Sequence, residues 1–502
     1  MTQPIGRRAL LGGAGVVALG AAGGWWWVAR ESSDPAAVTG AALVEPQVHT
    51  STGGLLDVRL VASEEVRALA GSDVRCLGYG ASVPGPTLRV APGDTLRVLL
   101  VNDLDEPTNL HVHGLQVSPT GASDDVFVSV APGQQHQYVY EIGEDHPTGT
   151  FWYHAHHHGS VADQVWRGLF GALLVLDPAA SARTERVLVV SDVTLAGGAV
   201  AGVTRHDRMA GREGALVLVD GQSAPEVVGA PGTVERWRVV NACTSRYLRP
   251  LLSTVGAAAV AGAGVVARDG RDLASGLGVG EVVVPPGGRA DLLVPVGQED
   301  LVLTTAPVDR GAGTGGTAGG GMGGMMGGMM GGGASDEQPS TLLTLRATGP
   351  VAPPSSTSSI DASTTAPPRD LRDVEPDRRR TLMLTSGMGM GQGMGGGMLF
   401  GIDGRTFEPG RTDQTVTLGT VEEWTLVNDT TMDHPFHLHV WPMQVLDGGE
   451  TPLLLDTVDV PAGERVVVRV AFDDFPGRTV YHCHVLDHED LGMMGTLEAL
   501  RP

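Results

Sequence analysis

The sequence is poor in cysteine, in positive charge and in sustained helical periodicity. Its three cysteines are too few for a disulfide framework. Lysine and arginine together number 34 against 57 acidic residues, and the formal net charge of −23 argues against a nucleic-acid partner, which requires a basic surface. By contrast, 73 glycines and 32 prolines favour many short strands and turns. We therefore expect an all-β protein, and 502 residues are enough for about three domains.

The N-terminus resembles a targeting segment. Arg7 and Arg8 precede an uncharged, Gly- and Ala-rich run at residues 9–29, as in a twin-arginine export signal. The same run is long enough to span a bilayer, and the tryptophans at 25–27 would suit a membrane interface. We expect residues 1–41 to be an export signal, with an uncleaved membrane anchor as the alternative. Either reading implies a periplasmic, extracellular or cell-envelope protein.

Two short patterns recur three times each along the chain. The first is a turn followed by an alternating strand that ends in Val-Asn, at residues 92–102, 231–241 and 418–428. The second is a turn containing Pro and Gly before another β-rich run, beginning at Ala131, Pro285 and Pro461. Such repetition predicts three homologous β-sandwich domains. We place them at residues 42–180, 181–348 and 379–502, with a linker at 349–378 whose first part is rich in Pro, Ser and Thr.

The repeats also locate the histidines. Most of the 16 histidines fall in four clusters, two in the first domain and two in the third, and each cluster holds a His-X-His pair. This spacing places both imidazoles on one face of a strand, which suits metal chelation. The middle domain has Pro250 and Leu252 at the positions that match the first pair. The four pairs are His111/His113, His154/His156, His437/His439 and His482/His484.

The segment 482–493 combines two kinds of ligand. Because side chains alternate along a strand, His482 and His484 should face one way and Cys483 the other. A thiolate, His488, the thioether of Met493 and one more imidazole form the ligand set of an electron-transfer copper. The matching segment of the first domain has Ala155 in place of the cysteine. We expect a thiolate copper in the third domain only.

Four motifs together resemble those of three-domain multicopper oxidases, and the resemblance runs from about residue 55 to the end. The motifs are His-Val-His-Gly at 111–114, Trp-Tyr-His-Ala-His at 152–156, His-Pro-Phe-His-Leu-His at 434–439, and the segment 482–493. The resemblance implies three cupredoxin-like Greek-key β-sandwich or barrel domains. It also implies four copper ions, one of type 1 and three in a trinuclear cluster that reduces dioxygen to two waters.

Carried onto this chain, the resemblance implies a complete set of copper ligands. They are His434, Cys483, His488 and Met493 for type 1 copper; His111 and His437 for type 2 copper; and His113, His154, His156, His439, His482 and His484 for the type 3 pair. Met494 is the competing axial ligand, but the family's axial position falls on Met493. Electrons would pass from Cys483 to its neighbours His482 and His484.

Reduction of dioxygen to water also needs protons, and two carboxylates match family positions. Asp124 follows the first histidine motif, with Asp125 as its possible substitute, and Glu489 directly follows His488. A carboxyl group within reach of the cluster can deliver protons. The alternative is that these residues are ordinary solvated loop acids.

Methionines gather in two glycine-rich tracts, residues 321–333 and 387–398, which together hold more than half of the chain's 16 methionines. Thioethers prefer Cu(I), and such insertions resemble those of bacterial cuprous oxidases. The alternative is a linker of biased composition. The residues that we consider for a substrate Cu(I) site are Met388, Met390, Met394, Met398, Asp429, Met432 and Asp433.

We therefore expect an oxidase, most simply a monomer, that takes electrons from Cu(I) and passes them to dioxygen. A laccase-like phenol oxidase is the alternative of the same class. A copper-storage or cell-division scaffold protein with the same fold is the alternative of another class, although such a protein would be expected to have lost ligands. Cys76 and Cys243 fall in different predicted domains. We expect two buried free thiols, with a disulfide between those domains as the alternative.

Overall fold

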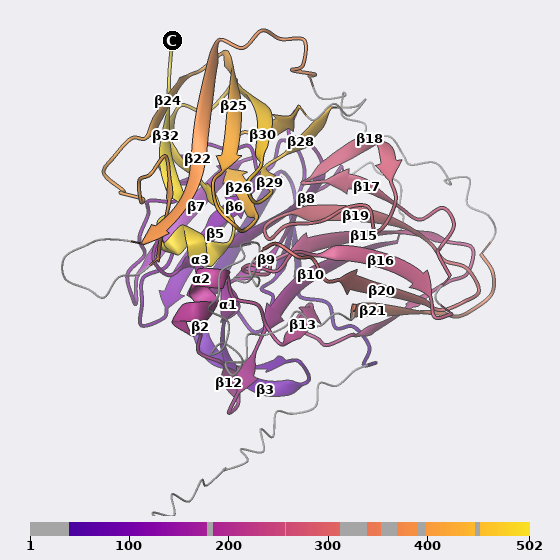
Figure 1. The fold of residues 1–502 in the computed structure, drawn as a ribbon. Helices are drawn as coiled ribbons and strands as arrows, with labels where there is room; N and C mark the ends of the chain where they lie inside the picture. Colours follow the sequence, from indigo (N-terminus) through magenta and orange to yellow (C-terminus); the bar gives the residue numbers. More distant parts are fainter. Residues whose placement is uncertain are drawn as a thin grey trace, which may run out of the picture. The chain divides into compact units, whose positions relative to one another are not determined.

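The computed structural model describes residues 40–177, 184–256, 258–311, 339–352, 369–388, 398–446 and 452–502. Within these residues the strands form six sheets, which associate in pairs around three buried apolar clusters. The expected all-β class with three sandwiches is confirmed. Figure 1 shows the first sandwich in purple, the middle one in pink and the third in orange to yellow.

The first sandwich pairs a five-stranded with a six-stranded sheet. In hydrogen-bonded order, the first sheet contains β1 (Val48–Thr50), β4 (Thr87–Val90), β9 (Phe170–Val175), β8 (Gly149–His154) and β6 (His111–His113). The second contains β11 (Leu195–Ala196), β12 (Ala199–Val200), β3 (Ser72–Tyr79), β2 (Leu55–Leu69), β5 (Thr95–Asp103) and β7 (Gln135–Glu141). Burial alternates along β5 and along the first half of β2, so each presents one apolar face to the core.

The middle sandwich pairs a six-stranded with a four-stranded sheet. The first contains β13 (Leu216–Val219), β10 (Glu185–Val193), β15 (Val234–Asn241), β19 (Arg289–Pro295), β17 (Gly264–Arg268) and β18 (Arg271–Leu277). The second contains β14 (Glu226–Gly229), β21 (Ser340–Ala347), β20 (Leu301–Ala306) and β16 (Arg249–Thr254). Its core is aliphatic apart from the fully buried Trp237 and the buried Cys243. Cys76 and Cys243 are both buried free thiols.

The third sandwich repeats this plan and carries the C-terminal segment of interest. One sheet contains β23 (Met398–Ile402), β22 (Arg378–Met388), β25 (Thr420–Asn428), β30 (Arg465–Phe472), β27 (Met443–Val445) and β28 (Leu453–Leu455). The other contains β24 (Gln414–Thr417), β32 (Met494–Leu500), β31 (Gly477–Cys483), β26 (His434–Leu438) and β29 (Thr457–Val460). Strand β26 pairs antiparallel with β31, which sets His437 opposite His482.

The recurring Val-Asn signature has a structural reason. Strands β5, β15 and β25 hold equivalent places, each between a parallel and an antiparallel neighbour. The buried terminal amides of Asn102, Asn241 and Asn428 each donate two hydrogen bonds to main-chain carbonyls. One of these carbonyls belongs in each case to the residue directly before the second repeat: Val130, Val284 and Val460. One side chain thus ties the two repeated patterns together in every sandwich.

Three short helices, α1 (Val161–Trp166), α2 (Arg205–Ala210) and α3 (Leu486–Asp490), gather beside the C-terminal strands (Figure 1). Ser160 does not cap α1 with its side chain. Instead, the Asp490 carboxylate at the end of α3 accepts hydrogen bonds from the main-chain amides of Gly159, Val161 and Ala162, so the third sandwich satisfies the free donors of α1. Of the residues that the structure describes, none lies in a helix long and apolar enough to cross a membrane, and residues 9–29 lie outside that part.

Candidate metal centre

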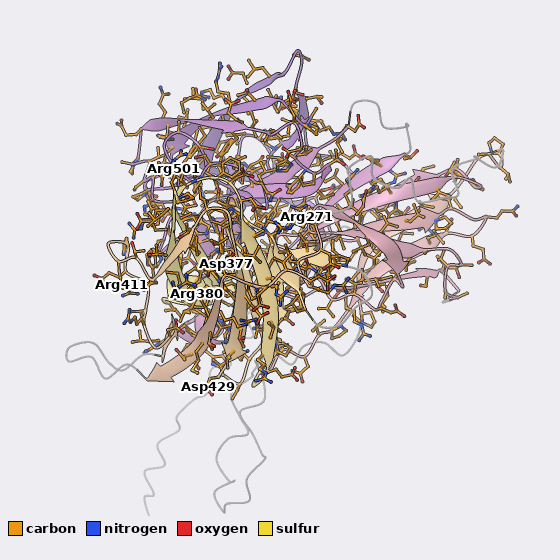
Figure 2. The ribbon with its side chains drawn as sticks, turned by 90° about the horizontal axis from the view of Figure 1, so that it is seen from above. Arg271, Asp377, Arg380, Arg411, Asp429 and Arg501 are labelled. Atoms are coloured by element: carbon orange, nitrogen blue, oxygen red, sulfur yellow. The ribbon has the colours of Figure 1, made fainter. Side chains whose placement is uncertain are left out.

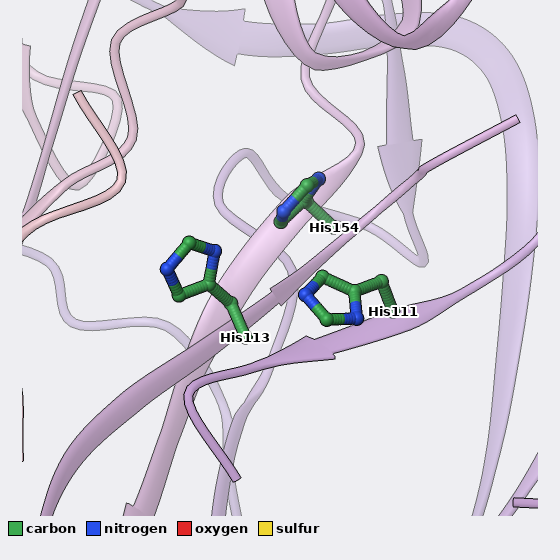
Figure 3. Close-up of side chains that lie close together, drawn as sticks. All are labelled: His111, His113 and His154. Carbon is green, nitrogen blue, oxygen red and sulfur yellow. The ribbon is translucent and has the colours of Figure 1, made fainter. Parts of the chain in front are cut away.

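The four His-X-His pairs meet between the first and third sandwiches. Strand pairing sets His111 on β6 opposite His154 on β8, and in Figure 3 the rings of His111, His113 and His154 lie close together. Rings from the two sandwiches then stack: His111 on His439 at 4.0 Å between centroids, and His113 on His437 at 3.8 Å. Every histidine of the four pairs is at most 2 % exposed. The sequence repeats alone could not establish this contact between sandwiches.

Potential ligand atoms converge in several overlapping groups within this cluster. Those with mutual distances below 4.8 Å include His111/His113/His154, His111/His437/His439 and His156/His439/His482. His484 belongs to none of these groups, but its ring lies 4.9 Å from that of His113 and 5.7 Å from that of His154. The candidate residues for the trinuclear cluster are therefore brought together in one buried place.

Burial keeps these imidazoles neutral. Removal from water disfavours the charged form, and it lowers the pKa of His154 and His156 to about 3 and that of His482 to about 4. The pKa values of the other five histidines of the pairs lie well below the usual value for the same first cause. A neutral imidazole has one nitrogen with a lone pair, which is the form that binds metals.

Hydrogen bonds fix which ring nitrogen is free. His154 Nδ1 lies 2.9 Å from the Ala155 carbonyl and His437 Nδ1 2.7 Å from the Asp456 carbonyl, so each Nδ1–H donates and each Nε2 keeps its lone pair. Buried ring nitrogens without a hydrogen-bond partner occur at His111, His113, His154, His437, His439 and His484. A buried polar atom without a partner costs about 1–3 kcal/mol of stability. Several unpartnered ring nitrogens that converge on one place are therefore consistent with a metal ion bound there.

A second group surrounds the buried thiol of Cys483. His434 Nδ1 lies 3.3 Å and His488 Nδ1 3.9 Å from its sulfur, and these two nitrogens are 3.3 Å apart. The opposite ring nitrogens point outward, with His434 Nε2 2.8 Å from Thr430 Oγ1 and His488 Nε2 3.2 Å from the Met209 carbonyl. Two Nδ1 atoms thus converge on one sulfur, an arrangement suited to a soft metal ion.

The two candidate axial methionines lie in different surroundings. Met493 is fully buried in the apolar cluster that contains Cys483, and its carbonyl accepts a hydrogen bond from the Cys483 amide. Met494 belongs instead to a small cluster with Val126 and Val480. Alternation along the chain therefore directs Met493, and not Met494, toward the core that holds the thiol.

Both candidate proton carriers touch candidate ligands. The Asp124 carboxylate lies 2.9 Å from His111 Nδ1, whereas the neighbouring Asp125 accepts from the amide of Phe127. Glu489 Oε2 lies 3.0 Å from His482 Nδ1, but neither Glu489 oxygen has a hydrogen-bond partner, because that nitrogen donates to the Cys483 carbonyl. Burial raises the pKa of Asp124 to about 8 and that of Glu489 to about 7. These two acids are buried and not solvated loop residues.

The residues considered for substrate Cu(I) are more scattered. Met432 is buried and Asp433 is half-buried. Asp429, labelled in Figure 2, is exposed. Met388 and Met398 pair across β22 and β23. Met390, Met394 and residues 321–333 lie outside the described residues.

Two residues beside the histidine cluster, the carboxylate of Asp456 and the guanidinium of Arg289, were not predicted from the sequence. Asp456 bonds to His113 and, through its carbonyl, to His437, while Arg289 of the middle sandwich binds the Asp456 carboxylate. Neither residue lies in a histidine motif or in a recognisable spacing. No local signal in the sequence marks them.

Comparison with known proteins agrees with this geometry. Family models described as multicopper oxidase match residues 60–180 and 373–500. The chain is 25 % identical to a multicopper oxidase of Staphylococcus haemolyticus, over 84 % of this chain and 83 % of that protein. It is 24 % identical to a laccase of Bacillus subtilis, over 85 % of this chain and 91 % of that protein.

A solved structure has the same overall fold. The multicopper oxidase of Campylobacter jejuni, described as a metallo-oxidase, superposes with a TM-score of 0.74 at 27 % identity and covers 93 % of this chain and 96 % of its own. The matched family models include every motif that forms the buried histidine cluster and the thiol group. With this fold, these motifs and these relatives, the chain belongs to the multicopper oxidases, copper-dependent oxidoreductases that use dioxygen as acceptor.

Proposed function

We propose that this chain holds four copper ions and oxidises small electron donors, Cu(I) foremost, with dioxygen as the acceptor. The convergence of buried, unpartnered imidazole nitrogens beside a buried thiol carries the proposal. The proposed ligands are His434, Cys483, His488 and Met493 for type 1 copper, His111 and His437 for type 2, and His113, His154, His156, His439, His482 and His484 for the type 3 pair.

When bound, copper supplies one-electron redox chemistry, and four ions together hold the four electrons that convert dioxygen to two waters. The chain connects the two groups of ligands by the shortest covalent route, because Cys483 shares peptide bonds with both His482 and His484. The sandwich cores around them exclude water.

Two buried carboxyl groups are suited to hold protons for this reaction. Asp124 contacts His111 at one side of the histidine cluster, and Glu489 lies beside His156 and His482 at another. Because neither Glu489 oxygen has a hydrogen-bond partner among the described residues, both are free to bind and release a proton. We assign both residues to proton delivery.

Cu(I) is the preferred donor in this proposal because described residues that flank both methionine tracts pack close to the Cys483 group. Gly311, the last described residue before the first tract, packs so closely on Thr431 and Met432 that a side-chain carbon there would lie 2.2 Å from the Thr431 carbonyl oxygen. Phe400, two residues after Met398 at the end of the second tract, stacks on the His488 ring at 4.0 Å. The described residues that flank the two tracts thus lie beside the place where electrons would enter.

A phenol has poorer access to the same place. The outer nitrogen of His488 is occupied by the Met209 carbonyl at the end of α2, so a phenol cannot contact it directly in this conformation. The similarity to a laccase keeps phenol oxidation as a second activity. A storage or scaffold role is disfavoured because every ligand of the oxidase set is present.

Removal of the methionine tracts should separate Cu(I) oxidation from phenol oxidation. Deleting residues 321–333 and 390–396, which leaves the β22–β23 pairing in place, should lower kcat/KM for Cu(I) about tenfold, the equivalent of about 1.4 kcal/mol, because soft ligands that collect Cu(I) are lost. Phenol oxidation should change less than about twofold. The measurement is steady-state oxygen uptake with Cu(I), a phenol and Fe(II) side by side.

A matched variant keeps the tract lengths and removes only the thioethers. Substituting leucine for each methionine of 321–333 and for Met390 and Met394 should reproduce most of the deletion effect on Cu(I). Equal losses with Cu(I) and the phenol would refute the role of the tracts.

We further propose export by the twin-arginine pathway, with residues 1–41 as signal or anchor, and a monomeric mature protein. The domain boundaries proposed from the sequence are 42–180, 181–348 and 379–502, with 349–378 as the linker. N-terminal sequencing of the mature protein tests the first point: a chain that starts at Met1 would exclude cleavage.

A further inference from the structure

The middle sandwich supplies none of the proposed copper ligands, yet one of its side chains reaches the histidine cluster. Arg289, the first residue of β19, is fully buried. Its two terminal nitrogens bind the Asp456 carboxylate as a fork, at 2.7 and 2.5 Å. Its Nε donates to the Thr150 carbonyl of the first sandwich at 3.1 Å. Its Nη1 also donates to the Gly287 carbonyl of the middle sandwich at 3.2 Å, so the guanidinium is fixed by groups from all three sandwiches.

Asp456 in turn holds one histidine from each of two sandwiches. Its Oδ1 lies 3.0 Å from His113 Nε2, and its main-chain carbonyl lies 2.7 Å from His437 Nδ1. The hydroxyl of the next residue, Thr457, lies 3.3 Å from each of these two nitrogens, His113 Nε2 and His437 Nδ1. One residue pair thus sets the orientation of two stacked imidazoles.

These contacts also decide which nitrogen of each ring is free. Since His113 Nε2–H donates to the carboxylate, its lone pair lies on Nδ1; since His437 Nδ1–H donates to the carbonyl, its lone pair lies on Nε2. Both of these nitrogens are buried and have no hydrogen-bond partner. A hydrogen bond at the far nitrogen is how proteins fix the tautomer of a metal-binding histidine.

Further features of the structure fit this arrangement. Gly114 directly follows His113 with φ +87°, and a side-chain carbon there would lie 2.4 Å from Arg289 Nη2 and 2.5 Å from Asp456 Oδ2. Asp269, in the turn between β17 and β18, accepts a hydrogen bond from the Arg289 amide at 2.8 Å. Gly287 of the middle sandwich packs on the ring of His484, where a side-chain carbon would come within 2.8 Å. The middle sandwich therefore contacts the cluster at more than one point.

We propose that Arg289 is a positioning residue of the copper cluster: through Asp456 it presets the orientation and tautomer of His113 and His437. This gives the middle sandwich a role in assembling the site, although it binds no copper itself. The inference rests on the proposed function, because it takes His437 as a type 2 ligand and His113 as a type 3 ligand.

The test compares copper-loaded full-length variants by copper content, blue absorption and the electron paramagnetic resonance signal of type 2 copper. Arg289→Met should retain the blue absorption, because the Cys483 group is untouched. It should lose or alter the type 2 signal and retain copper at that site roughly 10–100-fold more weakly. Arg289→Lys keeps the charge without the fork and should give an intermediate result.

Arg238→Met is the matched control. Arg238 lies in the same sandwich, is 4 % exposed, pairs with Asp291 and Glu185 and donates to the Thr150 hydroxyl, but it bonds neither to Asp456 nor to a proposed ligand. It should give wild-type copper content and type 2 signal. An equal loss in Arg238→Met, or a wild-type signal in Arg289→Met, would overturn the inference.

Two further variants decide the matter if Arg289→Met does not fold. Arg289→Lys and Asp456→Asn each keep polar groups at the site, and wild-type type 2 spectra in both would overturn the inference. Absence of the type 2 signal from the wild-type protein would instead refute the ligand assignment itself. That failure is seen before any substitution is made.

Discussion

Replacing Cys483 with serine is expected to abolish the blue colour and the oxidase turnover while the fold remains. The thiol is fully buried beside the Nδ1 atoms of His434 and His488, and no other cysteine among the described residues forms such a group with two imidazoles. A serine hydroxyl is a poor ligand for a soft ion, and the covalent link from the electron entry site to His482 and His484 would lose its starting atom.

The serine should cost stability without preventing folding. Burying a hydroxyl without a full set of partners costs about 1–3 kcal/mol, which is less than the 5–15 kcal/mol typical of a folded protein. Cys243→Ser is the matched control, since Cys243 is 1 % exposed, lies in the core of the middle sandwich and belongs to none of the groups of converging ligand atoms. The control should keep full colour and turnover. Visible absorption, oxygen uptake and thermal unfolding would be measured on both; a blue, active Cys483→Ser would contradict the assignment.

Substitution of the two buried acids should slow turnover strongly. Glu489→Gln and Asp124→Asn remove the ionisable proton while keeping shape, and general acid–base groups contribute about 10²–10⁴-fold to turnover. Copper content and blue absorption should persist in Glu489→Gln, because its oxygens make no hydrogen bond that orients a ligand. Asp124→Asn should in addition disturb His111, to which Asp124 is bonded.

Asp125→Asn provides the comparison for these acids. Asp125 directly follows Asp124 but bonds to the Phe127 amide, so its substitution should leave turnover near the wild-type value. Steady-state oxygen uptake at saturating donor is the measurement. Unchanged turnover in both Asp124→Asn and Glu489→Gln would remove the assigned proton role.

Much of the fold could be predicted because the sequence repeats where the structure repeats. The Val-Asn pattern marks Asn102, Asn241 and Asn428, whose amides bridge to the start of the second pattern in each sandwich. Spacing within a strand likewise predicts the paired histidines, since i and i+2 share a face. Local rules of this kind are visible in one sequence.

What could not be predicted depends on contacts between distant segments. Arg289 and Asp456 are separated by 167 positions and meet only when the middle and third sandwiches associate. The cap that Asp490 supplies to α1 and the Met209 carbonyl at His488 are likewise contacts between segments far apart in the chain. A buried Arg–Asp pair has no preferred spacing in a sequence, so no pattern predicts it.

The most direct test of the central claim is the number of electrons that the copper-loaded protein transfers per dioxygen. Oxygen uptake and Cu(I) consumption would be measured together, with an assay for hydrogen peroxide and with the Cys483→Ser variant as background. The proposed function predicts four Cu(I) oxidised per dioxygen, water as the product and no peroxide. Two Cu(I) per dioxygen with accumulation of peroxide, or equal uptake by Cys483→Ser, would contradict it.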